Sequence, residues 1–449
     1  MSHRTNRRTF IKNSTAAAAA APLVLSSVTQ AAPSDRLNIA AIGVGGKGRG
    51  DIASTSVGQN VVAICDVDEN TLGTAEKTYP DAKVYTDWRK LLEQKDIDAV
   101  TVSTPDHMHA PAAAAAMELG KHVYVQKPLA HTVFEARQMR LLAKKFGVVT
   151  QMGNQGHSGQ GYRTVVELVQ SGVIGKVKEA HAWSNRPIWP QGIGRPKGKD
   201  EVPKHLHWDN WIGVAPFRPF VGPQENSKRG RGVYHPFNWR GWLDFGVGAL
   251  GDMGCHIIDP VVWSLELKAP KRVWSSGPTP NKETFPNWGV IHYEFPKTQY
   301  TSGETIQMTW HDGGKKPSAE LAQLPKGQSV PDNGCLLIGE KGVMLCRHGG
   351  NPTLWPESEF AGVEVKLATG DDHYLQWTNA CKGNGKATSH FDYSGPLTET
   401  VLLGTIAIRF PEEKLEWDTE QLRVTNNDAA NQFVHKKYRK GWENKLLSR

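Results

Sequence analysis

Residues 37–48, LNIAAIGVGGKG, decide the fold of the first half of the chain. The apolar run from Leu37 to Val44 predicts a β-strand, and it leads directly into the pattern GxGxxG. The glycines of this turn are Gly43, Gly45, Gly46 and Gly48. Glycine permits a tight turn and a close approach of the backbone to a pyrophosphate, whose charge the N-terminus of the next helix stabilises. The stretch therefore predicts a dinucleotide-binding turn.

An acidic residue closes the next predicted strand, which covers residues 61–66. Asp66 lies 23 residues after Gly43, about the separation at which a carboxylate accepts hydrogen bonds from the ribose of a dinucleotide. Its charge would repel a 2′-phosphate, and Val67 rather than an arginine follows it. We therefore expect NAD as the cofactor in preference to NADP.

Further along, short apolar runs alternate with segments of helical composition. Strands are expected over residues 98–103, 122–126 and 148–151, and helices over residues 110–119 and 133–146. Strands that alternate with helices indicate a parallel, doubly wound α/β sheet. Residues 37–153 are therefore expected to form a Rossmann dinucleotide-binding domain.

Two polar motifs follow predicted strands, at the edge where open α/β sheets bind ligands. They are Ser103-Thr104-Pro105-Asp106-His107-Met108-His109 and Gln126-Lys127-Pro128. The residues expected to line the cofactor site are Thr104, Pro105, His109, Gln126 and Lys127. The ammonium of Lys127 would point towards the nicotinamide and the substrate. His107 and His109 could be read as a metal-binding pair, but we expect them to cap and line the start of the next helix, and no metal site is predicted.

The alternation stops after Gly153, and the remaining chain has the pattern of antiparallel strands with long loops. Ile306, Met308 and Trp310 share one face of a predicted strand, and residues 291, 293 and 295 alternate in the same way. One apolar face per strand indicates an antiparallel sheet with one buried side. Residues 184–232 form a long irregular stretch, which is typical of a functional loop. The predicted fold class is α/β followed by α+β.

The segment 234–256 carries the richest group of candidate active-site residues. If its end is helical, Asp252 and His256 are four residues apart and lie on one face. A carboxylate beside an imidazole can hold the ring in place and stabilise its charged form, as a general base requires. The pair is therefore a candidate for acid–base chemistry.

The chain contains 15 tryptophans, a high number, and several lie beside Arg, His and Asn. Tryptophan faces can cover the apolar side of a sugar ring while Arg, Asn and His bond its hydroxyls. The candidate substrate residues are Trp239 and Arg240, together with Asn154 and His157 in the loop after the last Rossmann strand. For any single tryptophan the alternative is a place in the core, and for Asn154 and His157 it is an ordinary domain-linking turn.

These motifs, in this order, resemble the glucose-fructose oxidoreductase, inositol dehydrogenase and rhizopine catabolism family (Gfo/Idh/MocA). The resemblance rests on the GxGxxG turn, the acidic end of the second strand, the Thr-Pro-x-x-x-His motif at residues 104–109, and Lys127-Pro128. The chain departs from the family at Gln126, where relatives usually have Glu, because an amide carries no charge.

The resemblance implies a second domain over residues 154–449, with an open, mostly antiparallel sheet that carries the substrate site. It also implies that Lys127, Asp252 and His256 form a catalytic triad. Sheets of this family often pair face to face, so the resemblance implies a homo-oligomer.

Residues 1–32 have the pattern of a targeting segment. A basic start precedes a run of mostly Ala and small residues, and Thr29-Gln30-Ala31 ends like a signal-peptidase site. The stretch Asn6-Arg7-Arg8-Thr9-Phe10-Ile11-Lys12 resembles the twin-arginine export signal. We therefore expect a bacterial protein exported in folded form, to the periplasm or otherwise out of the cytoplasm. An ordinary signal peptide or a basic tail is the alternative.

Composition excludes several classes of protein. Half of the net charge of +8 lies in the targeting segment, and the remainder is too small and too scattered for nucleic acid binding. No apolar run reaches the roughly 18–20 residues of a spanning helix, so no membrane insertion is expected after removal of the signal. The five cysteines are widely spaced without a CxxC, so neither a disulfide framework nor a structural zinc site is expected.

Together these features favour an exported NAD-dependent oxidoreductase that acts on a secondary hydroxyl of a sugar, polyol or glycoside. His256 would accept the hydroxyl proton, Lys127 would polarise the oxygen, and Asp252 would orient the base and the alcohol. Free NAD is scarce outside the cytoplasm, so we expect one NAD to be tightly bound. This supports an alternative, a redox-neutral sugar transhydrogenase or NAD-dependent glycosidase. A third possibility, a non-catalytic NAD- or sugar-binding protein, is disfavoured by the intact triad.

Overall fold

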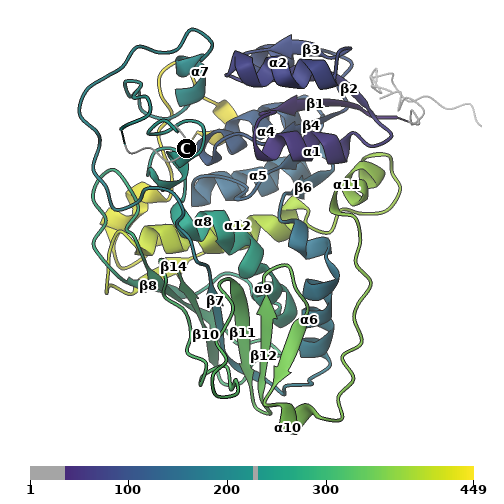
Figure 1. The fold of residues 1–449 in the computed structure, drawn as a ribbon, viewed down its shortest axis with the longest axis vertical. Coiled ribbons are helices and arrows are strands. Elements are labelled where there is room, and N and C mark those ends of the chain that lie inside the picture. The colour runs from purple at the N-terminus through teal and green to yellow at the C-terminus, as the bar shows by residue number, and fades with distance from the viewer. Residues whose placement is uncertain (1–35, 226–230, 449) are drawn as a thin grey trace, which may run out of the picture. The chain divides into compact units, whose positions relative to one another are not determined.

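A computed structural model describes residues 36–225 and 231–448 of the protein (Figure 1). The predicted targeting segment, residues 1–32, lies outside the described residues. Two sheets organise the described chain, one built from its first third and the other from the remainder.

The first sheet has six strands in the order β3-β2-β1-β4-β5-β6, and all neighbouring strands are parallel. The strands are β1 (Asn38–Ile42), β2 (Asn60–Cys65), β3 (Lys83–Tyr85), β4 (Ala99–Val102), β5 (His122–Val125) and β6 (Thr150–Met152). The helices between them are α1 (Lys47–Thr55), α2 (Glu69–Thr78), α3 (Trp88–Leu91), α4 (His109–Glu118) and α5 (Val133–Phe146). The strand order reverses between β1 and β4, which places a ligand crevice at their carboxyl ends. The predicted Rossmann fold is confirmed.

Local signals explain why α5 begins and ends where it does. Thr132 accepts a hydrogen bond from the N–H of Glu135, and the Glu135 side chain accepts one in return, which completes a capping box. Gly147 ends the helix with a φ of 64°, in the left-handed region that glycine adopts without strain. The next strand, β6, can therefore start three residues later.

The second sheet has nine strands in the order β13-β12-β11-β7-β10-β9-β8-β14-β15. The strands are β7 (Val177–Trp183), β8 (Arg272–Ser276), β9 (Val290–Pro296), β10 (Thr305–His311), β11 (Gly334–Gly339), β12 (Val343–Arg347), β13 (Pro352–Trp355), β14 (Leu415–Asp418) and β15 (Arg423–Val424). Strands β7 and β10 are parallel, and the other neighbours are antiparallel. The prediction of a mostly antiparallel second sheet is confirmed.

The predicted alternation on β10 and β9 builds the buried face of this sheet. Ile306, Met308 and Trp310 are opposite Phe295, Tyr293 and Ile291 across the strand pair, and all six are buried. The burial of these six side chains removes a large apolar area from water, which is the main stabilising contribution of the sheet.

The second half of the chain contains the helices α6 (Gln160–Gln170), α7 (Trp208–Ile212), α8 (Gly248–Ile257), α9 (Asp259–Leu265), α10 (Glu357–Phe360), α11 (His373–Cys381) and α12 (Phe391–Ala407). Of these, α6, α8, α9, α10 and α12 contact strands of the second sheet, whereas α11 contacts α1 of the first domain. Figure 1 shows α8 and α12 between the two sheets, and α12 contacts α5 on one side and β8 and β9 on the other. A Cβ on Gly404 would lie 2.1 Å from the Tyr293 hydroxyl oxygen, so only glycine lets α12 approach the sheet this closely.

The C-terminal segment 434–448 returns to the first domain. The N–H of Phe134 donates to the carbonyl oxygen of Val434 at 3.0 Å, and the Tyr438 hydroxyl donates to Glu135 Oε1 at 2.6 Å. The guanidinium of Arg89 lies 4.0 Å from the ring centroid of Trp442. These contacts tie the C-terminal segment to the first domain. The chain passes from the first sheet to the second near residue 153, and the residues from Arg36 onward form a single packed unit. No helix of the described ranges is long and apolar enough to cross a membrane.

Candidate active site

The glycine-rich turn between β1 and α1 is closed by backbone contacts that only glycine allows. Gly43 has a φ of +84°, and a Cβ there would lie 2.7 Å from the carbonyl oxygen of Ser103. A Cβ on Gly48 would lie 1.9 Å from the carbonyl oxygen of Gly43. Gly46 caps α1, whose first turn carries no acidic side chain. The turn with Gly43, Gly45, Gly46 and Gly48 therefore fits the pyrophosphate of a dinucleotide.

Asp66 follows β2 and is tied to the same turn. Its Oδ2 accepts a hydrogen bond from the N–H of Val44 at 3.0 Å, and its Oδ1 accepts one from the N–H of Asp68 at 3.1 Å. Burial raises the pKa of Asp66, against the lowering effect of these two bonds. The turn itself therefore holds the carboxylate at the end of β2, and the contact with a ribose that the sequence predicts there stays a prediction.

A part of the long irregular stretch crosses the end of β2, which the sequence did not predict. The N–H of Glu69 donates to the carbonyl oxygen of His205 at 2.9 Å, and the N–H of His207 donates to that of Val67 at 2.8 Å. His235 Nε2 lies 3.3 Å from Asp68 Oδ2. Residues 205–207 and 235 therefore lie against the ribose end of the candidate cofactor site.

Gln126 contacts a carboxylate that the sequence analysis missed. Asp51, fully buried on α1, accepts hydrogen bonds from Gln126 Nε2 at 2.9 Å, from Ser103 Oγ at 2.8 Å and from the Tyr374 hydroxyl at 2.9 Å. Lys47 forms an ion pair with the same carboxylate. An amide at position 126 suits this position because it donates to Asp51, whereas a glutamate would place two carboxylates together. The one signal in the sequence was the departure from Glu at this position.

The polar motif after β4 holds the turn that carries Lys127. Both ring nitrogens of His109 face carbonyl oxygens, that of Pro128 at 2.7 Å and that of Thr104 at 2.8 Å. The sequence analysis expected His109 to line the cofactor site. The side chain is instead buried, and it positions the Lys-Pro turn. Thr104 and Pro105 are partly exposed beside it, where a ligand can reach them. His107 faces the carbonyl oxygens of Phe245 and Trp211, so the two histidines do not face a common ligand.

Lys127 and Asp252 meet from different domains. Lys127 Nζ donates to Asp252 Oδ1 at 2.9 Å and to the Asp252 carbonyl oxygen at 2.5 Å. Arg240 Nε lies 3.3 Å from Oδ1 of the same carboxylate, and Arg186 Nε lies 3.6 Å from Oδ2. Burial raises the pKa of Asp252, but Lys127 and Arg240 outweigh this effect and hold the pKa well below its usual range. Arg186 lies three residues after the end of β7, inside the stretch 184–232 that the sequence marks as a functional loop, but no motif singles it out.

His256 lies one turn further along α8 and has a different environment from the predicted one. Its Nδ1 is buried and has no hydrogen-bond partner among the described residues. Its ring centroid lies 5.4 Å from that of His348. Burial, followed by the nearby charge of Lys127, lowers the pKa of His256 well below its usual value. The imidazole is therefore neutral at neutral pH.

The structure contradicts the predicted pairing of Asp252 with His256. The Asp252 carboxylate forms ion pairs with Lys127, Arg240 and Arg186. In the described part of the chain, no hydrogen bond joins this carboxylate to the His256 imidazole. Three cations attract a carboxylate more strongly than a neutral ring does, which is why the i, i+4 spacing does not produce the pair. Asp252 therefore positions Lys127 rather than the base.

Asn154 and His157 do not line the site, and the structure contradicts their predicted contact with substrate. Their exposed fractions are 0% and 2%. Asn154 Nδ2 donates to Asp259 Oδ2 at 3.0 Å, and His157 Nδ1 lies 3.1 Å from both carboxylate oxygens of Asp259. The His157 ring also stacks on Trp263 with centroids 4.0 Å apart. Both residues belong to a buried polar network that fixes the start of the second domain.

Trp239 likewise lies in a core, whereas Arg240 beside it reaches the site. Trp239 is 7% exposed and packs in an aromatic cluster with Trp211, Trp242 and Phe245. The guanidinium of Arg240 lies 4.3 Å from the Trp239 ring centroid. Trp239 is therefore a platform for Arg240 and not, as predicted, for a sugar ring, because its face is already covered.

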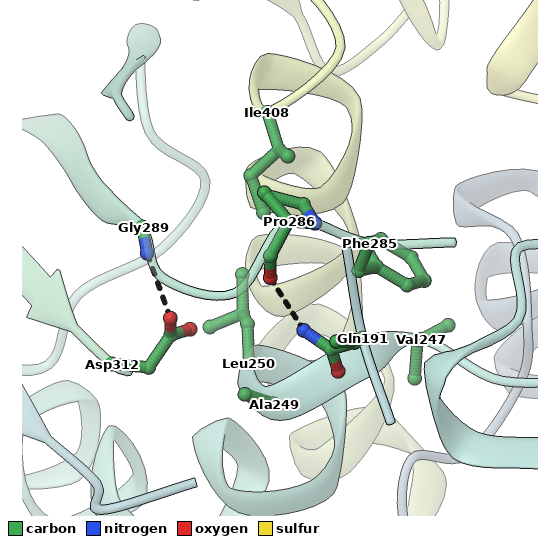
Figure 2. Close-up of a pocket in the computed structure, with 9 residues that line it drawn as sticks. All are labelled: Gln191, Val247, Ala249, Leu250, Phe285, Pro286, Gly289, Asp312 and Ile408. Atoms are coloured by element: carbon green, nitrogen blue, oxygen red, sulfur yellow. Dashed lines mark hydrogen bonds between the residues drawn. The ribbon is translucent and has the colours of Figure 1, made fainter. Parts of the chain in front are cut away.

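A small cavity lies behind α8 and is separate from these residues (Figure 2). Its polar lining is internally satisfied, since Gly289 N–H donates to Asp312 Oδ1 at 2.8 Å and Gln191 Nε2 donates to the Pro286 carbonyl oxygen at 2.7 Å. The volume open to the centre of a water molecule is about 10 Å³. Such a cavity holds at most one water and cannot admit a sugar.

The geometry defines a class: a dinucleotide-binding Rossmann domain joined to an open-sheet domain, with a lysine and a histidine at their junction. Family models agree with this description. Residues 37–154 match the oxidoreductase family with an NAD-binding Rossmann fold, and residues 162–327 match the C-terminal alpha/beta domain of the same oxidoreductase family. The chain belongs to the Gfo/Idh/MocA family of oxidoreductases, as its motifs predicted.

Curated relatives resemble part of the chain. An uncharacterized oxidoreductase, YdgJ, of Escherichia coli is 30% identical over 159 residues, which cover 34% of this chain and 45% of that protein. A glycosyl hydrolase family 109 protein of a Shewanella species is 33% identical over 159 residues, 33% of this chain and 35% of that protein. Inositol 2-dehydrogenase of Salmonella typhimurium is 31% identical over 132 residues, 29% of this chain and 39% of that protein. The similarity thus spans less than half the length of each of these relatives.

Solved structures share the fold over most of the chain. The WlbA dehydrogenase of Bordetella pertussis, in complex with NADH and UDP-GlcNAcA, has a TM-score of 0.56 at 16% identity, covering 85% of this chain and 99% of that one. The aldose-aldose oxidoreductase of Caulobacter crescentus has a TM-score of 0.53 at 16% identity, covering 85% of this chain and 100% of that one. At this level of identity the likeness shows the fold alone.

Proposed function

We propose that the protein is an NAD-dependent oxidoreductase that transfers hydride between nicotinamide and a secondary hydroxyl of a sugar, polyol or glycoside. The observation that carries the proposal is the position of Lys127, at the carboxyl end of β5 and 2.9 Å from Asp252, near the neutral imidazole of His256. An inositol dehydrogenase among the relatives agrees with a polyol or sugar substrate.

The residues present fit a dinucleotide. The turn at Gly43–Gly48 and the first turn of α1 would hold the pyrophosphate, and Asp66 would accept hydrogen bonds from the adenosine ribose. The Asp66 carboxylate favours NAD over NADP because a 2′-phosphate would meet its charge. When bound, the cofactor supplies the hydride acceptor, whereas the protein supplies orientation and electrostatics.

Three side chains have separate roles in the oxidation of the alcohol. The neutral imidazole of His256 accepts the hydroxyl proton, because its pKa leaves it uncharged at neutral pH. The Lys127 ammonium stabilises the negative charge that develops on the oxygen. Asp252 holds Lys127 in place because the Lys127 ammonium donates hydrogen bonds to both the carboxylate and the backbone carbonyl oxygen of Asp252.

A redox-neutral variant of this function is favoured by one feature. Residues 205–207 pair with the chain at the end of β2, beside the ribose position, which would slow the release of a bound NAD. An enzyme that keeps its cofactor can oxidise a substrate and reduce it again in one cycle, as a transhydrogenase or NAD-dependent glycosidase does. A relative named as a glycosyl hydrolase supports this second candidate.

The test begins with the purified protein, whose small molecules are released by denaturation and identified by mass spectrometry. We expect about one NAD per chain. Turnover is then followed by NADH absorbance, or by release of free sugar from glycosides without net NADH. His256→Ala should lower kcat by about 100-fold or more, the range of a lost general base. Unchanged turnover in this variant would show that His256 is not the base.

A further inference from the structure

Positive charge exceeds negative charge around the candidate substrate position. Lys127, Arg240 and Arg186 surround one carboxylate, Asp252, at 2.9, 3.3 and 3.6 Å. All four side chains are between 13% and 25% exposed, so water screens them only in part. The site therefore carries an excess of cations that a neutral sugar would not balance.

The other acidic group near these cations does not remove the excess. Asp106 is buried after β4 and accepts a hydrogen bond from the N–H of Val247 at 3.2 Å. Burial raises the pKa of Asp106 to about 7, although Lys127 and Arg240 oppose the rise. Asp106 therefore carries less than a full negative charge near neutral pH, and Gln126, next to Lys127, is uncharged.

Arg186 lacks an acceptor where its guanidinium is buried. Its Nη1 donates to Asn185 Oδ1 at 2.5 Å. Its Nε is buried, lies 3.6 Å from Asp252 Oδ2, and has no hydrogen-bond partner among the described residues. The side chain as a whole is 25% exposed, so a ligand can reach other parts of it but not the buried Nε.

Arg240 is held rigidly on the other side of Asp252. Its Nη1 donates to the carbonyl oxygen of Phe237 at 3.1 Å, and its guanidinium lies 4.5 Å from the Phe237 ring centroid and 4.3 Å from that of Trp239. Little side-chain entropy remains to be lost when a ligand binds such an arginine. A planar guanidinium matches a planar carboxylate better than it matches a hydroxyl.

We propose that the substrate carries a carboxylate, as a uronic acid or its glycoside does, and that Arg186 binds this carboxylate with support from Arg240. The inference rests on the proposed function, because it names the substrate class of the same site. A carboxylate there would lie against the exposed part of the Arg186 side chain and would balance the excess charge.

The test compares matched acidic and neutral ligands on the NAD-loaded protein by isothermal titration calorimetry. The ligands are D-glucuronate and D-glucose, their methyl β-glycosides, and D-glucose 6-sulfate. We expect the two carboxylates to bind at least about 10-fold more tightly than their neutral counterparts and more tightly than the sulfate ester. Equal affinities would overturn the inference, and so would a preference for the sulfate ester.

Variants assign the preference to Arg186. Arg186→Met should reduce the ratio of acidic to neutral affinity to near one, and Arg186→Lys should give an intermediate ratio because it keeps the charge without the planar fork. Arg195→Met is the matched control, since Arg195 is 47% exposed and pairs with Glu283 instead. Thermal unfolding checks that each variant is folded. A ratio that survives in folded Arg186→Met would overturn the assignment.

The two proposals fail in different ways. If neutral sugars are oxidised as readily as acids, the proposed function stands and the carboxylate inference fails. If glucuronate binds in an Arg186-dependent manner but neither NADH nor a released sugar is formed, the inference stands and the proposed function fails.

Discussion

At the scale of single residues, Gln126 donates one hydrogen bond to the buried carboxylate of Asp51, at 2.9 Å, beside the candidate cofactor site. We expect Gln126→Glu to lower the free energy of unfolding by about 1–3 kcal/mol, because two carboxylates in a buried site repel each other and one loses its donor. Urea denaturation measures the change.

Two further variants isolate this interaction. Gln328→Glu makes the same change in an exposed loop and should be within about 0.5 kcal/mol of the wild type. The double variant Gln126→Glu with Asp51→Asn exchanges the two groups and should recover most of the lost stability. If the double variant is as unstable as Gln126→Glu alone, charge repulsion is not the cause.

His256 leads to a prediction for pH dependence. Burial and Lys127 lower its pKa well below 6.5, so the folded state disfavours the protonated ring. Protonation of His256 should therefore lower turnover only well below pH 6.5, whereas Asp106, whose pKa is about 7, titrates at higher pH. The stability that the neutral ring contributes is present above about pH 6.5 and is lost as the pH falls below that value.

A pH profile of kcat/KM on the NAD-loaded protein tests this prediction. A midpoint near the ordinary histidine value of about 6.5 that persists in Asp106→Asn would contradict the low pKa. Urea denaturation of wild type and His256→Asn between pH 5 and 8 checks the stability, since only the wild type should lose this contribution on acidification.

At the scale of elements, a buried ion pair joins α5 and α12, helices from the two halves of the chain. Arg137 on α5 forms two hydrogen bonds of 2.7 Å with Glu399 on α12, and Glu399 is 6% exposed. We expect Arg137→Ala to lower the free energy of unfolding by about 3 kcal/mol or more, because a buried carboxylate is left without its partner. Chemical denaturation measures the loss.

The same helix pair offers a matched control. Arg140 on α5 pairs with Asp392 on α12 at 3.0 Å, but both side chains are at least 40% exposed. Arg140→Ala should cost less than about 1 kcal/mol, as exposed ion pairs do. Similar losses in the two variants would show that burial does not decide the strength of the Arg137 pair.

At the scale of the whole molecule, the C-terminal segment should stabilise the first domain. Val434, Tyr438, Trp442 and Leu447 are buried although they lie in the last 16 residues. Deletion from Val434 onward should lower the melting temperature by several degrees and reduce the amount of bound NAD, because Glu135 loses its bond from Tyr438 and Arg89 loses its contact with Trp442. Differential scanning fluorimetry and NAD quantification measure both effects. A truncated protein with unchanged melting temperature would contradict this role.

The fold could be predicted from the sequence where its signals are local. The turn at Gly43–Gly48, the acid at position 66 and the Lys-Pro pair each follow a strand directly, so spacing alone identifies them. The strand β3 was missed because its three residues, Lys83–Tyr85, form no apolar run.

The site could be predicted only in part, because burial and partners depend on distant contacts. Asn154 and His157 have the chemistry of sugar-binding residues, but Asp259, about 100 positions later, takes up their polar atoms. Asp51 and Arg186 lack any motif and are found only through what lies next to them. Asp252 has the right spacing for His256 and nevertheless pairs with Lys127, since charge outweighs proximity along the helix.

The position of α12 between the two sheets has a consequence for how the protein is made. The helix is encoded in residues 391–407, yet it covers α5 of the nucleotide-binding half. A ribosome that has translated the first 153 residues therefore carries a nascent domain with one apolar face still open to water. That face is closed only when nearly the whole polypeptide has emerged, so the nucleotide-binding half exposes apolar surface during most of its synthesis.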